Sequence, residues 1–544
     1  MPSAAGHGSS RDPGAALHSS FLSGWIVVPF LYLTLIASRL APMLLGSELN
    51  PDESQLMAQV MRLRLHPIPW RGMDGTTSGP LNTWALALAH AAGLPFDYHG
   101  VHALAAVVLA TTCALTYVTL RVLAGRTIAQ WGAAASVLPI VLVQGANYTH
   151  YSSELVPALL ESVALCGFAV GLVRPRARIL SAIVCGLAIG ALPWAKLQAT
   201  AGATALGAWV AWRMWSAHRR RDTALFIGAL LLPSALLLAV VITGGAWNDF
   251  WSSYVLGNLG YVGRQGPGGV VRRALAMLSA PAGPSLVGVL CFAACWGWRK
   301  GPGWKTAAAP LREFSVAVAL LAVATLLSVL TPRTFHAHYH LLLFQPLALA
   351  SACLLAIWRS PDGRDADRRL ALGVFAALVL GSSLLSIPAA AAGVRSTLAL
   401  RQRIDATPEA RIASAIRTVA PAGQRLVAWG WMPALYVRTG MAPGTRHAVC
   451  HFVIDPGPAR ERMRATFLDD VRTERPDVIV DAVAGGCFRW SWDRTDRLES
   501  FPELFEFVTA HYALVSEMTL DENEPQAPVR IYALRPADAS APPR

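Results

Sequence analysis

Two adjacent carboxylates, Asp52 and Glu53, are the side chains best suited to chemistry in this sequence. They follow Pro51, whose fixed φ angle suits the first turn of a helix, where the helix dipole favours the charged form of an acid. An ionised aspartate at a membrane surface can act as a general base on a hydroxyl group, and its neighbour can bind a divalent metal ion or orient the substrate. Acids at a helix start can also serve only to cap it, so residue type alone leaves both interpretations open.

The pair lies in a long polar loop that we place at residues 46–100. Its stretch from Pro69 to Asn82 is rich in polar and turn-forming residues and contains a further acid, Asp74. A simple connector does not need such a stretch. We therefore predict that this first outer loop is catalytic, with Asp52 and Glu53 as catalytic residues. Asp74 is a secondary acid candidate, and Glu53 and Asp74 are the candidate ligands of a metal ion.

Basic and imidazole side chains that can neutralise a phosphate also fall in the predicted outer loops. A lysine at the end of an apolar segment, such as Lys196, can equally snorkel to the membrane surface. The alternating histidines at 336, 338 and 340 share a face only in a strand and diverge at a helix start, so a metal site there is the less favoured alternative. The candidate phosphate-binding residues are Lys196, Arg264, Arg333, His338, Tyr339 and His340, and a secondary acid candidate in the second outer loop is Glu154.

Long apolar segments must position these side chains. The chain has 544 residues, of which 54% are apolar and 15% charged, and its mean hydropathy is +0.42. Soluble domains are about a quarter charged and lack repeated apolar runs of about 20 residues. We predict an α-helical polytopic membrane protein with about eleven transmembrane helices. The predicted spans are 21–45, 101–123, 131–143, 155–173, 179–193, 200–215, 224–242, 274–298, 314–330, 339–358 and 370–392.

Alternate loops differ in positive charge, which predicts the orientation. One set carries 17 Arg and Lys residues and the opposite set carries 8. Because the basic set faces the cytoplasm, residues 1–20 form a cytoplasmic tail, residues 21–392 the membrane domain, and residues 393–544 an extracytoplasmic domain. Since these clusters account for the net charge of +13, no nucleic-acid partner is expected. The cytoplasmic loops are shorter than the roughly 30-residue βαβ unit that a nucleotide site requires.

The segment after residue 392 has the pattern of a small α/β domain. Short apolar runs at 425–429, 476–481, 512–518 and 529–534 predict buried strands, and helices are predicted from about 458 to 473 and from 502 to 510. Two cysteines of this domain, Cys450 and Cys487, lie in an oxidising compartment, and the sequence leaves open whether they pair.

An acidic pair in a long first outer loop, about eleven spans and an outer C-terminal domain resemble the GT-C superfamily of polyprenyl-phosphate-sugar-dependent glycosyltransferases. That superfamily holds protein O-mannosyltransferases and lipid A aminoarabinose transferases. Three segments add to the resemblance: Leu187–Lys196 is similar to a small-residue helix ending in a lysine near the lipid phosphate, His338–Leu349 to a basic-Tyr motif before a Pro-bearing helix, and Asn147–Glu154 to the second outer loop. Histidine stands at 338 where arginine or lysine is more usual.

The resemblance implies an inverting transfer of a sugar from a polyprenyl-phosphate donor to an acceptor hydroxyl, with Asp52 as the general base. It also implies an extracytoplasmic active site in a bacterial inner membrane, with membrane lipids as partners. The acceptor, whether glycan, lipid or protein, is not written in the sequence, and metal dependence stays open. Two other classes fit many spans with few polar residues: a transporter or flippase of a glycolipid, and a non-catalytic subunit of an envelope assembly complex.

Overall fold

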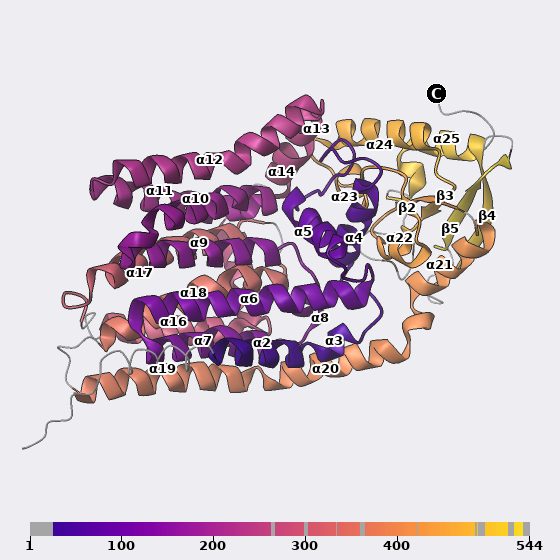
Figure 1. Ribbon diagram of the computed structural model, residues 1–544. Coiled ribbons are helices and arrows are strands. Elements are labelled where there is room, and N and C mark those ends of the chain that lie inside the picture. Colours follow the sequence, from indigo (N-terminus) through magenta and orange to yellow (C-terminus); the bar gives the residue numbers. More distant parts are fainter. Residues whose placement is uncertain are drawn as a thin grey trace, which may run out of the picture.

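Long helices that run roughly side by side make up most of the protein in a computed structural model, and a small sheet lies beyond one end of them (Figure 1). The structure describes residues 26–262, 267–298, 303–332, 335–359, 365–421, 423–484, 487, 496–520 and 527–536. Two of the predicted phosphate-binding residues, Arg264 and Arg333, lie outside the described residues, as does the predicted tail 1–20.

Eight of the predicted spans each fall on one helix, whereas 21–45, 274–298 and 370–392 each extend over two helices within the described residues. Of the helices in the described ranges, seven are long and apolar enough to cross a membrane, or up to eight if a pair bent by 104° counts as one span. The protein is therefore a multi-pass membrane protein. The bundle helices are α2 (Val27–Ser38), α3 (Leu40–Met43), α6 (Tyr98–Ala124), α7 (Arg126–Leu142), α9 (Leu155–Val173), α10 (Arg178–Ala195), α11 (Thr200–Ser216), α12 (Arg220–Thr243), α15 (Pro267–Ser279), α16 (Gly283–Trp298), α17 (Ala309–Val329), α18 (His340–Trp358), α19 (Asp365–Leu385) and α20 (Ile387–Gln402).

Small residues let neighbouring helices of the bundle approach closely. At Gly190 of α10, an added Cβ atom would lie 2.0 Å from the backbone oxygen of Leu230 in α12. Only glycine fits there, as is common where membrane helices pack backbone to backbone. The predicted small-residue helix ending at Lys196 is thus fixed in place by its packing.

The first outer loop folds into two short helices at the same end of the bundle as the sheet, α4 (Pro51–Leu63) and α5 (Pro80–Ala91) (Figure 1). Asn50 caps α4 because its side-chain oxygen accepts a hydrogen bond from the Asp52 N–H at 3.0 Å, and Pro51 occupies the first helical position. Asp52 and Glu53 therefore lie in the first turn, as the sequence predicts.

The C-terminal region contains a five-stranded sheet in the order β2-β1-β3-β5-β4. Strand β1 is parallel to both β2 and β3, whereas β5 runs antiparallel to β3 and β4. The strands are β1 (Arg425–Trp429), β2 (Ala442–Pro443), β3 (Val478–Asp481), β4 (Tyr512–Met518) and β5 (Val529–Leu534), and the helices α21 (Pro408–Val419), α22 (Ala434–Thr439), α23 (His451–Ile454), α24 (Arg460–Glu474) and α25 (Pro502–His511). The predicted strands and helices of this region are confirmed.

Side chains of β1 alternate between the two faces of the sheet, as strand geometry requires. Leu426 and Ala428 pack with α21 and α22 on one face, and Val427 and Trp429 pack with α24 and α25 on the other. The sheet is therefore covered by helices on both sides. The two cysteines whose pairing the sequence left open, Cys450 and Cys487, are free thiols.

Direct contacts join the first outer loop to the C-terminal region. Arg62 of α4 forms a buried ion pair with Glu474 of α24 at 3.0 Å, and the Asp74 N–H donates to the backbone oxygen of Arg446 at 2.8 Å. The candidate catalytic loop and the sheet thus lie at one end of the bundle. Further short elements of the described chain are α8 (Ala146–Thr149), α13 (Trp247–Phe250), a π-helical turn η3 (Trp251–Gly257), α14 (Asn258–Val262) and the 3₁₀ turn η4 (Ala337–Tyr339).

Candidate active site

The acidic pair is divided between a cavity and the protein interior. Asp52 is 29% exposed and lines a cavity of about 430 Å³. Glu53 is fully buried, and its carboxylate lies 3.1 Å from His102 Nε2 and accepts from the Leu49 N–H at 2.6 Å. Burial raises the pKa of Glu53, but the neighbouring His102 outweighs burial and lowers it. Of the two acids, only Asp52 faces the cavity, while Glu53 holds the start of α4 through Leu49 and His102.

Lys196 and Glu154 form a buried ion pair at the edge of the same cavity. Lys196 ends α10, and its Nζ also donates to Ser153 Oγ at 2.7 Å and lies 5.3 Å from the centre of the Tyr339 ring. Burial raises the pKa of Glu154, but the Lys196 ammonium outweighs burial and lowers it to about 2. The pair fixes the Lys196 ammonium in the cavity wall, beside the Tyr339 ring.

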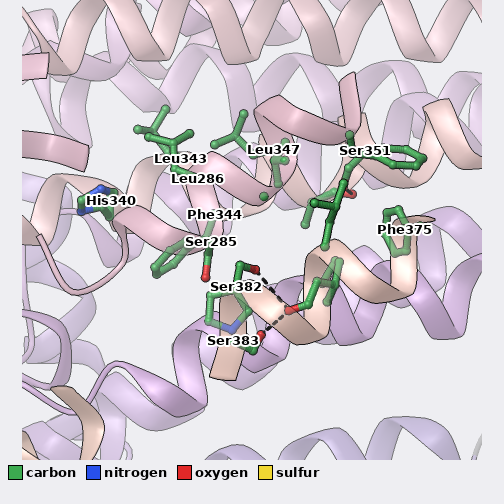
Figure 2. A pocket seen from close by; sticks show the side chains of 18 residues that line it. Ser285, Leu286, His340, Leu343, Phe344, Leu347, Ser351, Phe375, Ser382 and Ser383 are labelled. Carbon is green, nitrogen blue, oxygen red and sulfur yellow. Dashed lines mark hydrogen bonds between the residues drawn. The ribbon is translucent and has the colours of Figure 1, made fainter. Parts of the chain in front are cut away.

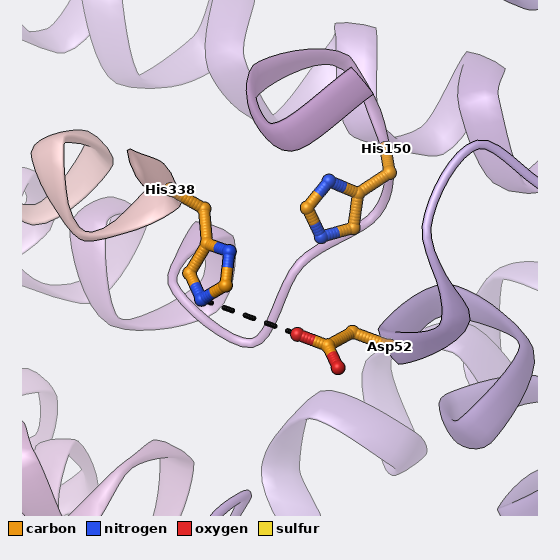
Figure 3. A group of neighbouring side chains, drawn as sticks. All are labelled: Asp52, His150 and His338. Atoms are coloured by element: carbon orange, nitrogen blue, oxygen red, sulfur yellow. Dashed lines mark ion pairs between the residues drawn. The ribbon is translucent and has the colours of Figure 1, made fainter. Parts of the chain in front are cut away.

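A carboxylate and two imidazoles meet at one point of the site (Figure 3). Asp52, His150 and His338 each offer one ligand atom, and these atoms lie within 4.8 Å of one another. His338 Nε2 is 4.0 Å from Asp52 and 3.7 Å from Glu154. The Nδ1 atom of His150 is hydrogen-bonded to the carbonyl oxygen of Ala146. Its Nε2 atom has no hydrogen-bond partner among the described residues.

This donor set suits a zinc-like ion, because two imidazoles and a carboxylate are ordinary zinc ligands and the second nitrogen of His150 is held by a carbonyl. It differs from the two metal ligands that the sequence suggests. In the described ranges, Glu53 pairs with His102 and Asp74 lies beside His447, so neither joins the three-residue group.

Asp74 holds the loop that forms one wall of the cavity. Its Oδ1 atom accepts from Ser253 Oγ at 2.7 Å and from the Thr76 N–H at 2.8 Å, and Oδ2 lies 3.6 Å from His447 Nδ1. Residues 76–78 line the cavity, while Asp74 itself does not. The structure therefore gives this acid a positioning role and separates it from Asp52.

The three alternating histidines, His336, His338 and His340, do not all face the same cavity. The rings of His336 and His338 stack with centres 5.5 Å apart, and both line the cavity that contains Asp52, the candidate catalytic cavity. His340 lies in another cavity, of about 30 Å³, between α16, α18 and α19 (Figure 2). Its Nδ1 atom is 3.2 Å from the Tyr148 hydroxyl. His340 therefore does not line the cavity that contains Asp52.

A second cavity of about 440 Å³ adjoins the first. The two share Thr77, Lys196 and Tyr339 in their walls. The other residues of the second cavity are mostly apolar, and two of them, Leu259 and Leu327, are 61% and 62% exposed at the surface of the bundle. Lys196 and Tyr339 therefore lie between a polar cavity that reaches Asp52 and a more apolar one whose wall includes exposed leucines.

Several residues of the site were not predicted. His150 lies in the second outer loop, and its only signal was an imidazole in a segment already recognised as polar. Trp431 and His451 of the C-terminal region also line the catalytic cavity. Their distance along the chain from Asp52 leaves no local pattern that connects them.

Comparison with solved structures identifies the architecture. No protein-family model matches the chain, and no curated protein sequence matches it. ArnT from Cupriavidus metallidurans bound to undecaprenyl phosphate superposes with a TM-score of 0.59 at 13% identity, covering 95% of this chain and 99% of that one. Its apo state gives 0.56 at 13% identity over 94% and 98% of the two chains.

The arabinofuranosyltransferase AftD from Mycobacteria gives a TM-score of 0.51 at 17% identity, over 93% of this chain and 41% of that chain. All of these proteins are GT-C superfamily members. The chain has the GT-C fold. The resemblance expected from the sequence is therefore confirmed at the level of the fold, over nearly the whole of the chain.

Proposed function

We propose that this GT-C protein is a membrane glycosyltransferase that moves a sugar from a polyprenyl-phosphate donor to an acceptor hydroxyl. The observation that carries the proposal is the meeting of the two cavities at Lys196 and Tyr339. An apolar cavity between helices suits a polyprenyl chain, and the Lys196 ammonium suits its phosphate. The polar cavity then receives the sugar beside Asp52. The ArnT structure was solved with undecaprenyl phosphate, which is a lipid of this class.

In the proposed mechanism, Asp52 takes the proton from the acceptor hydroxyl as its oxygen attacks the anomeric carbon. The bond between that carbon and the phosphate oxygen breaks, and the electron pair leaves with the lipid phosphate, whose charge Lys196 balances. One displacement inverts the anomeric centre. Asp52, His150 and His338 would hold a divalent ion, which would supply further positive charge to the site.

We further propose that all eleven predicted segments cross the membrane. The helices α2, α7 and α11 are shorter than the seven long ones, with 12, 17 and 17 residues. If they cross together with the bent pair, the charge bias of the loops places the active site and residues 393–544 outside a bacterial inner membrane. A sugar donor carried by a membrane lipid can reach an active site on that side.

The first test is sugar transfer in proteoliposomes supplied with radiolabelled polyprenyl-phosphate sugars and native membrane acceptors. Asp52→Asn is expected to lower the transfer rate by about 10²–10⁴-fold, the usual contribution of a general base. Asp405→Asn is the matched control, because Asp405 is exposed and outside the cavity, and it should transfer at the wild-type rate. A chelator reports on the metal.

Full activity of Asp52→Asn would remove the assigned base. Uptake of a glycolipid without covalent transfer would favour a transporter instead. Co-purification with a partner, together with intact cellular function of Asp52→Asn, would favour a non-catalytic subunit.

A further inference from the structure

The C-terminal domain supplies an aromatic wall to the catalytic cavity. Trp431 is half-buried and lines this cavity together with His451. The two rings stack with centres 5.5 Å apart and planes 23° from parallel, and His451 is in turn 3.5 Å from the Asp455 carboxylate. The His451 ring therefore packs against Trp431, and the Asp455 carboxylate orients that ring.

Trp431 lies where the topology of the sheet favours ligand binding. Strand β1 has β2 on one side and β3 on the other, and both pair with it in parallel. The helix between β1 and β2, α22, covers one face of the sheet, and the helix before β3, α24, covers the other. The chain thus switches faces at the carboxyl end of β1, which is where open α/β sheets bind ligands.

The loops at this switch point are fixed against the membrane bundle. Gly430, which links β1 to Trp431, has a φ of +128° and accepts a hydrogen bond from the Cys450 N–H at 3.0 Å. Phe452 packs so closely on the π-helical turn that a Cβ atom at Gly257 would lie 2.6 Å from its ring. The tryptophan is therefore held in position above the cavity by both domains.

The second cavity separates the role of Trp431 from that of the donor site. Lys196 and Tyr339 line both cavities, whereas Trp431 and His451 line only the polar one. A donor that enters from the lipid side contacts Lys196 first. The aromatic wall from the C-terminal domain is then left for the other substrate.

We propose that Trp431 is the platform on which the acceptor lays a sugar ring, so that the acceptor is a glycan or glycolipid. This inference rests on the proposed function and names its acceptor class. The flat apolar indole matches the C–H face of a sugar ring, and the polar groups of Asn50, Gln55 and Asn147 in the same cavity suit its hydroxyls. A peptide acceptor presents no such flat apolar face at its reacting hydroxyl.

Binding is tested without turnover on full-length Asp52→Asn protein in lipid nanodiscs. The probes are methyl α-glucopyranoside, methyl α-mannopyranoside and methyl α-galactopyranoside, observed by saturation-transfer NMR. Signal from at least one glycoside is expected. It should fall several-fold in Asp52→Asn/Trp431→Ala and be largely kept in Asp52→Asn/Trp431→Phe. The matched control adds Trp247→Ala, since Trp247 is 46% exposed and outside the cavity.

The same substitutions in the otherwise wild-type protein separate the two substrates kinetically. Trp431→Ala should raise the KM for the acceptor about tenfold and leave the KM for the donor within twofold, because aromatic anchors contribute much of the binding energy of a site. Circular dichroism and thermal unfolding verify that each variant is folded.

The inference is overturned if no glycoside gives signal, if Trp431→Ala leaves the signal unchanged, or if Trp431→Ala changes only the KM for the donor. Transfer to a serine- and threonine-containing peptide that depends on Trp431 would also overturn it. In these cases loss of activity in Asp52→Asn would still support the glycosyltransferase. Absence of transfer in wild type with retained glycoside binding at Trp431 would overturn the proposed function alone.

Discussion

The two ends of the helix bundle differ in the burial and pairing of their charged side chains. At the end away from the sheet, Arg174, Arg176 and Arg220 are exposed to solvent. At the catalytic end, Lys196 and Glu53 are buried and each has a specific partner. Exposed charges of the first kind contribute little to stability, whereas a buried pair becomes strongly destabilising once one partner is removed. The contrast indicates that charged side chains are solvated at one end and fix the local geometry at the other.

The largest effect is expected from Lys196. Lys196→Met leaves Glu154 as a buried carboxylate without its main counter-charge, so the free energy of unfolding should fall by about 3–5 kcal/mol. Transfer should fall by about 100-fold or more, because the phosphate also loses its charge partner. Thermal unfolding and the transfer assay measure the two effects. The double variant Lys196→Met/Glu154→Gln should recover most of the stability and none of the activity; recovery of both would show that Lys196 is only structural.

The next largest effect is expected where the C-terminal domain meets the first outer loop. Arg446 makes two hydrogen bonds with the Asp470 carboxylate, at 2.8 and 2.9 Å, and lies 3.3 Å from Asp249. Arg446→Met should lower the free energy of unfolding by about 3 kcal/mol and transfer by about tenfold, since its backbone also holds Asp74.

Arg462→Met is the matched control for Arg446, because Arg462 pairs with the same Asp249 at 3.1 Å but is 44% exposed. Its effect on the free energy of unfolding should stay below about 1 kcal/mol. Equal losses in the two variants would contradict the distinction between buried and exposed pairs. Urea titration of the nanodisc-embedded proteins gives the comparison.

A smaller, pH-dependent effect is expected from His447. It is 1% exposed, its ring nitrogens have no hydrogen-bond partner among the described residues, and burial lowers its pKa from 6.5 despite the nearby Asp74. The unfolded chain therefore binds a proton that the folded chain excludes as pH falls below 6.5. Stability should be complete above pH 6.5 and decline below it, by no more than about 1.4 kcal/mol per pH unit.

His447→Phe should remove this part of the pH dependence. The measurement is the change in Tm between pH 7.5 and pH 5.5, determined for the wild type and for His447→Phe. Subtracting one change from the other cancels the contribution of groups that titrate in both proteins. A variant whose Tm falls by as much as that of the wild type would show that His447 binds its proton equally well in the folded and unfolded chain.

The smallest effect is expected at the opposite end of the bundle. Arg213 and Glu313 form an ion pair there, but their side chains are 27% and 26% exposed. Arg213→Met should change the free energy of unfolding by less than about 1 kcal/mol and leave transfer unchanged. A loss of transfer would show that this end also takes part in catalysis.

Local sequence signals predicted the elements well. The start of α4 at Pro51, the strand at 425–429 and the apolar helices follow from caps, alternation and length, which are properties of neighbouring residues. Such signals could not predict that Glu53 turns to His102 while Asp52 faces the cavity, because the direction of each side chain depends on what packs around α4.

Contacts between distant segments were beyond the same signals. The pairing of Asp74 with His447, and the presence of Trp431 in the catalytic cavity, depend on how the C-terminal domain docks on the bundle. The π-helical turn that supports this docking has no sequence signature of its own. Polar residues could be recognised as candidates from their types, but their grouping required the structure.

The separate entrances to the site have a consequence for how turnover is supplied. On the proposed function, the donor arrives by lateral diffusion in the bilayer and the acceptor by diffusion from water, through cavities that share only the wall at Thr77, Lys196 and Tyr339. The spent carrier can return to the lipid while the product leaves to the aqueous side, so neither departure blocks the other. The reaction then needs no compulsory order of binding. Its rate depends on the surface density of the donor in the bilayer and on the concentration of the acceptor in water.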